Sequence, residues 1–111
     1  MAQSREMVMI MDEHSFEMNN VIASKRIDIL EIASLRGARN VRIFGSFSRG
    51  DFGPDSDIDL LVEMDESRSL LDMAGLKIDL EELMGRRVNI VTPDSIYWLV
   101  RRKIIGEAKP L

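Results

Sequence analysis

The chain has 111 residues, which is enough for one domain with a single hydrophobic core and too few for two. Hydrophobic residues make up 45% of it and charged residues 31%, as in ordinary soluble globular domains, and no apolar run reaches the roughly 20 residues that cross a bilayer. The net charge of −4 gives no overall preference for nucleic acid, so tight binding of long DNA or RNA is not expected. Cysteine is absent, which excludes disulfides, thiol catalysis and thiolate zinc sites, and we expect a cytoplasmic protein that does not enter a membrane.

Residues 1–14 show no clear hydrophobic period, and we expect them to form a flexible N-terminal segment ahead of a domain that covers residues 15–111. An adaptable methionine-rich contact segment is the alternative. Residues 16–36 carry apolar side chains at helical spacing, which predicts a long helix. Ser15 suits the N-cap of this helix, and Gly37 suits the position just after its end.

A strand is predicted next, because Val41 and Ile43 alternate with a charged residue and precede Gly45. Residues 46–49 then fit a short helical turn, and the glycines, proline and aspartates of residues 50–55 indicate a loop. This loop leads to a second strand over residues 57–63, whose alternate apolar side chains are expected to enter the core: Ile58, Leu60 and Val62.

A second long helix is predicted over residues 69–84. Ser69 and Asp72 have the spacing of a capping box, although aspartate replaces the usual glutamate or glutamine. Gly75 weakens the helix, so a bend or break is expected there, and Gly85 is expected to end it.

Residues 87–91 predict a third strand, in which the side chain of Asn89 points away from the core. Thr92 and Pro93 then have the residue types of an N-cap and a first helical position, so we expect a last helix from Thr92 to Gly106. Helices and strands in this order predict an α+β domain with one small sheet.

Two carboxylates follow a glycine-containing turn at close spacing, and this is the main indication of function. In a strand, Asp57 and Asp59 project from the same face with Cα atoms about 6.6 Å apart. Carboxylate oxygens are preferred ligands of Mg²⁺, and the backbone N–H groups of a turn such as Gly45-Ser46 bind phosphate, so a nucleoside triphosphate is the expected ligand. The alternatives are two exposed aspartates on an edge strand and a turn that only connects strand and helix. Aspartate is depleted in strands, and such local conflicts are expected at functional sites.

Arg49 has two interpretations. It can pair with Asp51 or Asp55 on the surface, or its guanidinium can steady phosphate groups.

The segments Gly45-Ser46-Phe47-Ser48-Arg49-Gly50 and Ser56-Asp57-Ile58-Asp59-Leu60-Leu61-Val62-Glu63 resemble the GSxxRG…SDxDLxV signature of the DNA polymerase β-like nucleotidyltransferase superfamily. The short chain is most similar to its minimal nucleotidyltransferases, often antitoxins paired with a HEPN-domain ribonuclease toxin. The resemblance implies a mixed sheet with flanking helices and a two-metal Mg²⁺ site. It also implies transfer of AMP from ATP to a hydroxyl of the HEPN toxin. On this view Asp57 and Asp59 hold metal, while Gly45, Ser46 and Arg49 hold the nucleotide.

The chain departs from the family pattern at the third carboxylate, which the family carries on the next core strand. Here Gly85-Arg86-Arg87-Val88 leads to Asn89 instead of aspartate. An amide can offer a carbonyl oxygen to a metal but cannot accept the proton of an attacking hydroxyl. Loss of a positioned general base typically costs about 10²–10⁴ in rate, so Asn89 is expected to mark an impaired catalytic position.

Three functions remain open from the sequence. The first is AMP transfer to a toxin, the second is a binding module that neutralises its partner by occlusion, and the third is nucleotidyl transfer to a small molecule or a nucleic-acid end. A homo- or hetero-oligomer is compatible with each. Tyr97 and Trp98 are expected to pack or to contact a partner, and residues 101–103, all basic, to complement the helix end or to meet an acidic partner.

Overall fold

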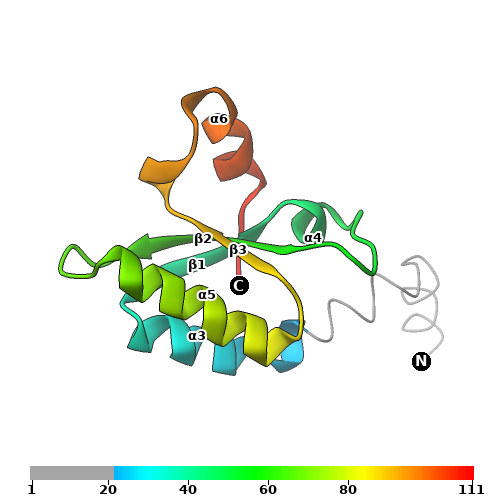
Figure 1. The fold of residues 1–111 in the computed structure, drawn as a ribbon. Coiled ribbons are helices and arrows are strands. Elements are labelled where there is room, and N and C mark those ends of the chain that lie inside the picture. The colour runs from blue at the N-terminus through cyan, green and yellow to red at the C-terminus, as the bar shows by residue number, and fades with distance from the viewer. Residues whose placement is uncertain (1–21) are drawn as a thin grey trace, which may run out of the picture.

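The structure is a computed structural model that describes residues 22–111 (Figure 1). The expected flexible segment and the beginning of the first predicted helix therefore lie outside the described residues. The helices of the described part are α3 (Arg26–Leu35), α4 (Ser46–Arg49), α5 (Leu70–Met84), the 3₁₀ helix η1 (Pro93–Ser95) and α6 (Trp98–Glu107). The strands are β1 (Ala38–Phe44), β2 (Ile58–Met64), β3 (Val88–Val91) and β4 (Lys109–Pro110).

These strands form one mixed sheet in the order β3-β2-β1-β4. β2 runs parallel to β3, whereas β1 is antiparallel to both β2 and β4. Helices α3 and α5 cover one face of the sheet, and α6 lies on the other side (Figure 1). The predicted α+β fold with a small mixed sheet is confirmed. No helix within residues 22–111 is long and apolar enough to cross a membrane.

The main core lies between the sheet and the helix pair α3 and α5. The predicted inward residues of β2 are buried there, and they pack with Ile29, Ala33, Leu76, Leu80 and Val88. Leu61 points to the opposite face and is also fully buried. Ile96, which follows η1, is the other buried apolar side chain outside the main core. The sheet therefore excludes water on part of its second face as well.

The local signals for α4 and α5 predicted these helices well. Ser69 caps α5 and its hydroxyl accepts the backbone N–H of Leu71 at 3.2 Å, while the Asp72 carboxylate accepts the N–H of Ser69 at 3.0 Å. The predicted break at Gly75 is wrong, because α5 is continuous to Met84. A Cβ atom at Gly75 would lie 2.5 Å from the guanidinium of Arg36, so this glycine makes room for a neighbouring side chain.

Two of the four acidic residues of α5, Asp79 and Glu81, attach the helix to neighbouring elements. Asp79 accepts a hydrogen bond from Nε of Arg36 at 2.9 Å, which connects α5 to the end of α3. Glu81 accepts the backbone N–H of Val88 at 3.0 Å and thereby attaches α5 to the first residue of β3. Glu82, by contrast, is exposed.

The predicted last helix is wrong in its extent. Residues 93–95 form only a 3₁₀ turn, which Ser95 closes by accepting the N–H of Thr92 and donating to its carbonyl, both at 3.0 Å. Ile96 then adopts an extended conformation and is buried, so the chain leaves the helical path to bury this side chain. Helix α6 begins only at Trp98, and it continues past Gly106 to Glu107.

Candidate active site

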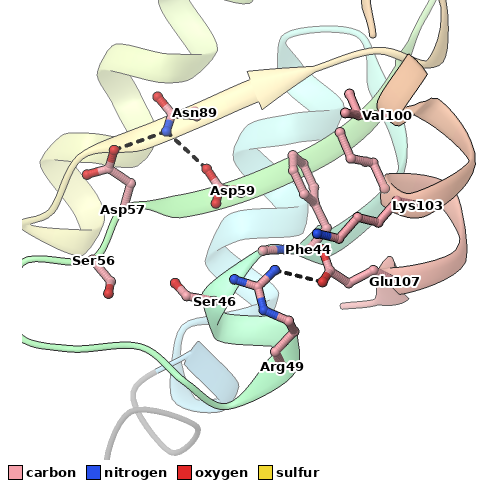
Figure 2. Close-up of a pocket in the computed structure, with 12 residues that line it drawn as sticks. Phe44, Ser46, Arg49, Ser56, Asp57, Asp59, Asn89, Val100, Lys103 and Glu107 are labelled. Atoms are coloured by element: carbon pink, nitrogen blue, oxygen red, sulfur yellow. Dashed lines mark hydrogen bonds and ion pairs between the residues drawn. The ribbon is translucent and has the colours of Figure 1, made fainter. Parts of the chain in front are cut away.

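A pocket of about 520 Å³ lies beside the end of β1, the short helix α4 and the beginnings of β2 and β3, with α6 along its other side (Figure 2). It contains all six residues that the sequence singles out: Gly45, Ser46, Arg49, Asp57, Asp59 and Asn89. Six further residues complete its wall: Phe44, Ser56, Val100, Lys103, Ile104 and Glu107.

The sheet register brings the polar side chains of this pocket together. Asp59 of β2 pairs with Phe44 at the end of β1 on one side and with Asn89 of β3 on the other. Asp57 lies immediately before β2, in the loop that leads into it. The amide nitrogen of Asn89 donates to Asp57 at 3.1 Å and to Asp59 at 3.0 Å, so one amide bridges the two carboxylates (Figure 2).

The pKa of Asp59 reflects its burial and its closeness to Asp57 and Asn89. Burial raises the pKa of the Asp59 carboxyl above its ordinary value of 3.8; the hydrogen bond from Asn89 opposes the shift and the neighbouring charge of Asp57 adds to it. A positive charge placed between the two aspartates would relieve both unfavourable effects.

Gly45 permits a close approach of backbone and carboxylate. Its φ of +72° and ψ of −153° are accessible essentially only to glycine. A Cβ atom here would lie 2.3 Å from Oδ2 of Asp59, so no other residue fits without displacing that carboxylate. Ser46 begins α4 directly after this turn and lines the same pocket.

The residues present fit a magnesium ion. Mg²⁺ is typically held by one or two carboxylates together with substrate phosphates and water, and no larger protein cage is needed. Asp57 and Asp59 would supply the carboxylates, which lie close enough for the single amide nitrogen of Asn89 to donate to both. Within residues 22–111 no group of three or more histidine, cysteine, aspartate or glutamate side chains is placed to hold a metal, so the site relies on this pair.

Arg49 forms one of the two surface pairs predicted for it and also contacts a carboxylate at the pocket. Its Nε lies 3.1 Å from Asp51, as the surface interpretation expects, and its Nη1 lies 2.7 Å from Glu107 at the pocket. Within the described residues, Asp55, the other predicted partner, is not among the ion-pair partners of Arg49.

Glu107 is the charged pocket residue in contact with Gly45 and Arg49 that sequence reasoning missed. Its carboxylate accepts the backbone N–H of Gly45 at 3.1 Å as well as the bond from Arg49, and its side chain is only 14% exposed. The hydrogen bond from Arg49 and, to a lesser degree, that from Gly45 lower the pKa of Glu107, while burial opposes the change. Two donors that were predicted to bind phosphate are thus held by an internal carboxylate.

One signal for Glu107 is present in the sequence. It ends α6, where the helix dipole disfavours a negative side chain, so a carboxylate there needs a partner from elsewhere. The identity of that partner requires the fold, because the contacts of Glu107 join positions about 60 residues apart.

Arg86 positions the loop that carries Asp57. Its Nη1 donates to the carbonyls of Gly53 at 3.2 Å and Ser56 at 2.7 Å, and its guanidinium lies 5.4 Å from the ring centre of Phe47. Two carbonyls and an aromatic face hold this cation in place, which fixes the approach to β2.

Comparison with known proteins identifies the family of this fold and pocket. Residues 20–111 match the model of the nucleotidyltransferase domain. A chain of Methanocaldococcus jannaschii that is named as a candidate protein adenylyltransferase is 42% identical over 80 residues, which cover 72% of this chain and 86% of that one. The protein adenylyltransferase MntA of Thermococcus cleftensis is 36% identical over 77 residues, covering 69% and 78% of the two chains.

Solved structures agree with this assignment. A structure described as a minimal nucleotidyltransferase superposes with a TM-score of 0.76 at 42% identity, and the match covers 83% of this chain and 94% of that one. A toxin–antitoxin crystal structure with AMP-PNP shares the fold, with a TM-score of 0.64 at 20% identity over 74% and 68% of the two chains. The expected resemblance to minimal nucleotidyltransferases is therefore confirmed, and the chain belongs to the nucleotidyltransferase domain family.

Proposed function

We propose that the chain is a Mg²⁺-dependent protein adenylyltransferase that acts as an antitoxin, transferring AMP from ATP to a hydroxyl group of a HEPN-domain toxin. The observation that carries the proposal is the convergence of Asp57, Asp59 and the Gly45-Ser46 turn on one open pocket. The names of the relatives support it: two are called protein adenylyltransferases, and a structure with the same fold is a toxin–antitoxin complex with AMP-PNP.

In the proposed reaction the acceptor oxygen forms a bond to the α-phosphorus, and the bond from that phosphorus to the bridging oxygen breaks to release pyrophosphate. Asp57 and Asp59 would hold Mg²⁺, which when bound neutralises charge on the triphosphate and on the leaving group. The N–H of Gly45, the hydroxyl of Ser46 and the guanidinium of Arg49 would orient the phosphates. The acceptor proton leaves to water, because the amide of Asn89 cannot accept it.

The open pocket suits a protein acceptor better than a small molecule that must be enclosed. The pocket is open, and residues 22–111 form a single sheet layer with helices and no second lobe that could surround another substrate. A protein surface can present its hydroxyl to the pocket without such a lobe.

Calorimetry with ATP, with and without Mg²⁺, tests the nucleotide site. Binding should require Mg²⁺ and should be lost in the Asp57→Ala, Asp59→Ala double variant, with circular dichroism confirming that the variant is folded. Unchanged affinity in the folded double variant would remove these residues from the site.

Transfer is tested with labelled ATP and the purified product of the reading frame next to this chain's gene. Label should enter that protein with the wild type and not with Asp57→Ala. The second candidate function, neutralisation by occlusion, is favoured by the presence of Asn89 at the third position. It would be supported if the two proteins bind and toxicity is suppressed while no label is transferred by the wild type.

A further inference from the structure

Helix α6 is unusual because none of its ten residues is buried. Every other helix longer than one turn in the described part contributes side chains to the core. In α6, Trp98 is 72% exposed, Leu99 65% and Ile105 41%. Figure 1 shows the helix standing off the face of the sheet that α3 and α5 leave uncovered. Large apolar side chains that stay in water at this density indicate a surface that a partner covers.

The two sides of α6 have different neighbours. Val100, Lys103, Ile104 and Glu107 follow one another at the i, i+3, i+4 and i+7 positions of one helical face, and all four line the pocket. Four residues at the same i, i+3, i+4 and i+7 spacing form the opposite face of the helix, which points away from the pocket. We call it the outer face of α6, and its members, all exposed, are Trp98, Arg101, Arg102 and Ile105.

The outer face combines apolar and cationic groups. Its two arginines stand between a tryptophan and an isoleucine, and tryptophan and arginine are the residues most enriched at the energetic centres of protein interfaces. Arg101 has only a 3.8 Å contact with the fully exposed Asp94. In a chain with a net charge of −4, this local positive charge favours a partner surface that is acidic and apolar.

We propose that the outer face of α6 is the docking surface for the protein that accepts AMP, and that this protein presents an acidic, apolar surface to it. The proposal rests on the proposed function for the identity of the occupant. A partner bound here lies one helix diameter, about 10–12 Å, from the pocket that the inner face of the same helix lines. A segment of the partner that passes the edge of α6 can therefore bring a hydroxyl to the nucleotide.

A second copy of the chain is a poorer occupant. In a symmetric dimer the same patch meets itself, so Arg101 and Arg102 of one copy would face the same residues of the other. Like charges in such a contact repel, which leaves an acidic surface of a different protein as the better complement.

The test measures binding of the neighbouring gene's purified product in the absence of nucleotide, so that affinity does not depend on transfer. Trp98→Ala, Arg102→Glu and the double variant are compared with wild type. We expect the double variant to weaken binding at least tenfold and each single variant to weaken it measurably. The controls are Ile78→Ala, which truncates an exposed apolar side chain of α5 on the other face of the sheet, and Arg39→Glu, a charge reversal at the far end of β1; both should bind like wild type.

Several results would overturn the proposal. Affinity of the folded double variant within twofold of wild type would exclude the outer face. Sedimentation showing that the chain self-associates, and that the double variant abolishes this, would make a second copy the occupant. Binding of a single-stranded RNA 20-mer that depends on Trp98 and Arg102, with no binding of the protein, would make nucleic acid the occupant.

The same variants separate this proposal from the proposed function. Under the docking proposal, the double variant raises the acceptor concentration needed for half-maximal AMP transfer and leaves the rate at saturation unchanged. If the partner binds through the outer face and wild type transfers no AMP, the docking proposal stands and the adenylyltransferase function fails. If wild type transfers AMP and the double variant does so equally well at every acceptor concentration, the docking proposal fails and the function stands.

Discussion

The side chain at position 89 decides how the two aspartates are held. Asn89 donates to both carboxylates, and its hydrogen bond to Asp59 stabilises the charged form of that group. Aspartate has nearly the same volume, but it removes the donor and adds a third negative charge, which offers both a metal ligand and a possible general base.

We therefore predict that Asn89→Asp raises AMP transfer to the partner by at least about tenfold, the low end of what a lost base costs. Incorporation of labelled AMP by the two variants, with Asp57→Ala as the blank, measures this. Signal at the level of the blank from both would favour the occluding module. Equal and strong signal from both would show that another group takes the proton.

The same substitution should also change how strongly Mg²⁺ affects thermal stability, which can be measured without an activity assay. Three unbridged carboxylates repel one another, so the melting temperature of Asn89→Asp without metal should fall below that of wild type, and Mg²⁺ should raise it by more than in wild type. Differential scanning fluorimetry with and without Mg²⁺ checks this. A variant that melts like wild type under both conditions would show that position 89 does not face a metal site.

Glu107 accepts hydrogen bonds from Gly45 and Arg49, the donors proposed to bind the triphosphate, so removing its charge should have opposite effects on nucleotide binding and on stability. We predict that Glu107→Gln binds MgATP more tightly than wild type and that its free form melts at a lower temperature at pH 7. Because the pKa of Glu107 is lowered from its usual value of 4.5, its stabilising contribution is present above that value and is lost as the pH falls through the lowered pKa. The difference in melting temperature should therefore stay constant from pH 7 down to about pH 5 and shrink as the pH falls further. Weaker MgATP binding in the variant would instead make Glu107 part of the nucleotide site.

Among individual residues, the sequence predicts those site residues whose positions follow from short-range patterns. The spacing of Asp57 and Asp59 and the alternation around Asn89 are local, and the structure brings these residues together. Glu107 could be flagged only as a carboxylate at an unfavourable helix end, because its partners lie about 60 residues earlier in the chain.

Among the helices and strands, α5 begins at a capping box formed by the side chains of Ser69 and Asp72. We predict that Ser69→Ala lowers the free energy of unfolding by about 1 kcal/mol, within the 0.5–2 kcal/mol typical of a lost N-cap. Urea denaturation followed by circular dichroism measures it, and Ser69→Asp, which can still cap, should retain most of the stability. Loss of stability in Ser69→Asp as large as in Ser69→Ala would indicate that the hydroxyl has a role other than capping.

Elements with strong terminal signals were predictable, and those that depend on tertiary packing were not. Gly45 and Gly50 bracket α4, and Ser69 and Gly85 bracket α5, so their boundaries follow from local chemistry. The interruption between η1 and α6 depends on burying Ile96. The two-residue strand β4 exists only because β1 offers it an edge.

For the whole molecule, hydrophobic period predicted an α+β class but not the strand order. The parallel pairing of β2 and β3 places Asp59 opposite Asn89, and this register determines the composition of the pocket. Only the family resemblance implied a mixed sheet, because pairing between distant strands leaves no pattern within either strand.

The weak attachment of α6 has a consequence for how the molecule opens. Local unfolding costs least where few apolar contacts are lost, so amide hydrogens of α6 should exchange with solvent by opening of that helix alone, while those of α5 require disruption of the core. Hydrogen exchange followed by mass spectrometry should show residues 98–107 exchanging orders of magnitude faster than residues 76–84. Equal protection of the two segments would mean that the domain opens only as a unit. Among the helices of residues 26–107, the one beside the candidate pocket is thus expected to open most readily.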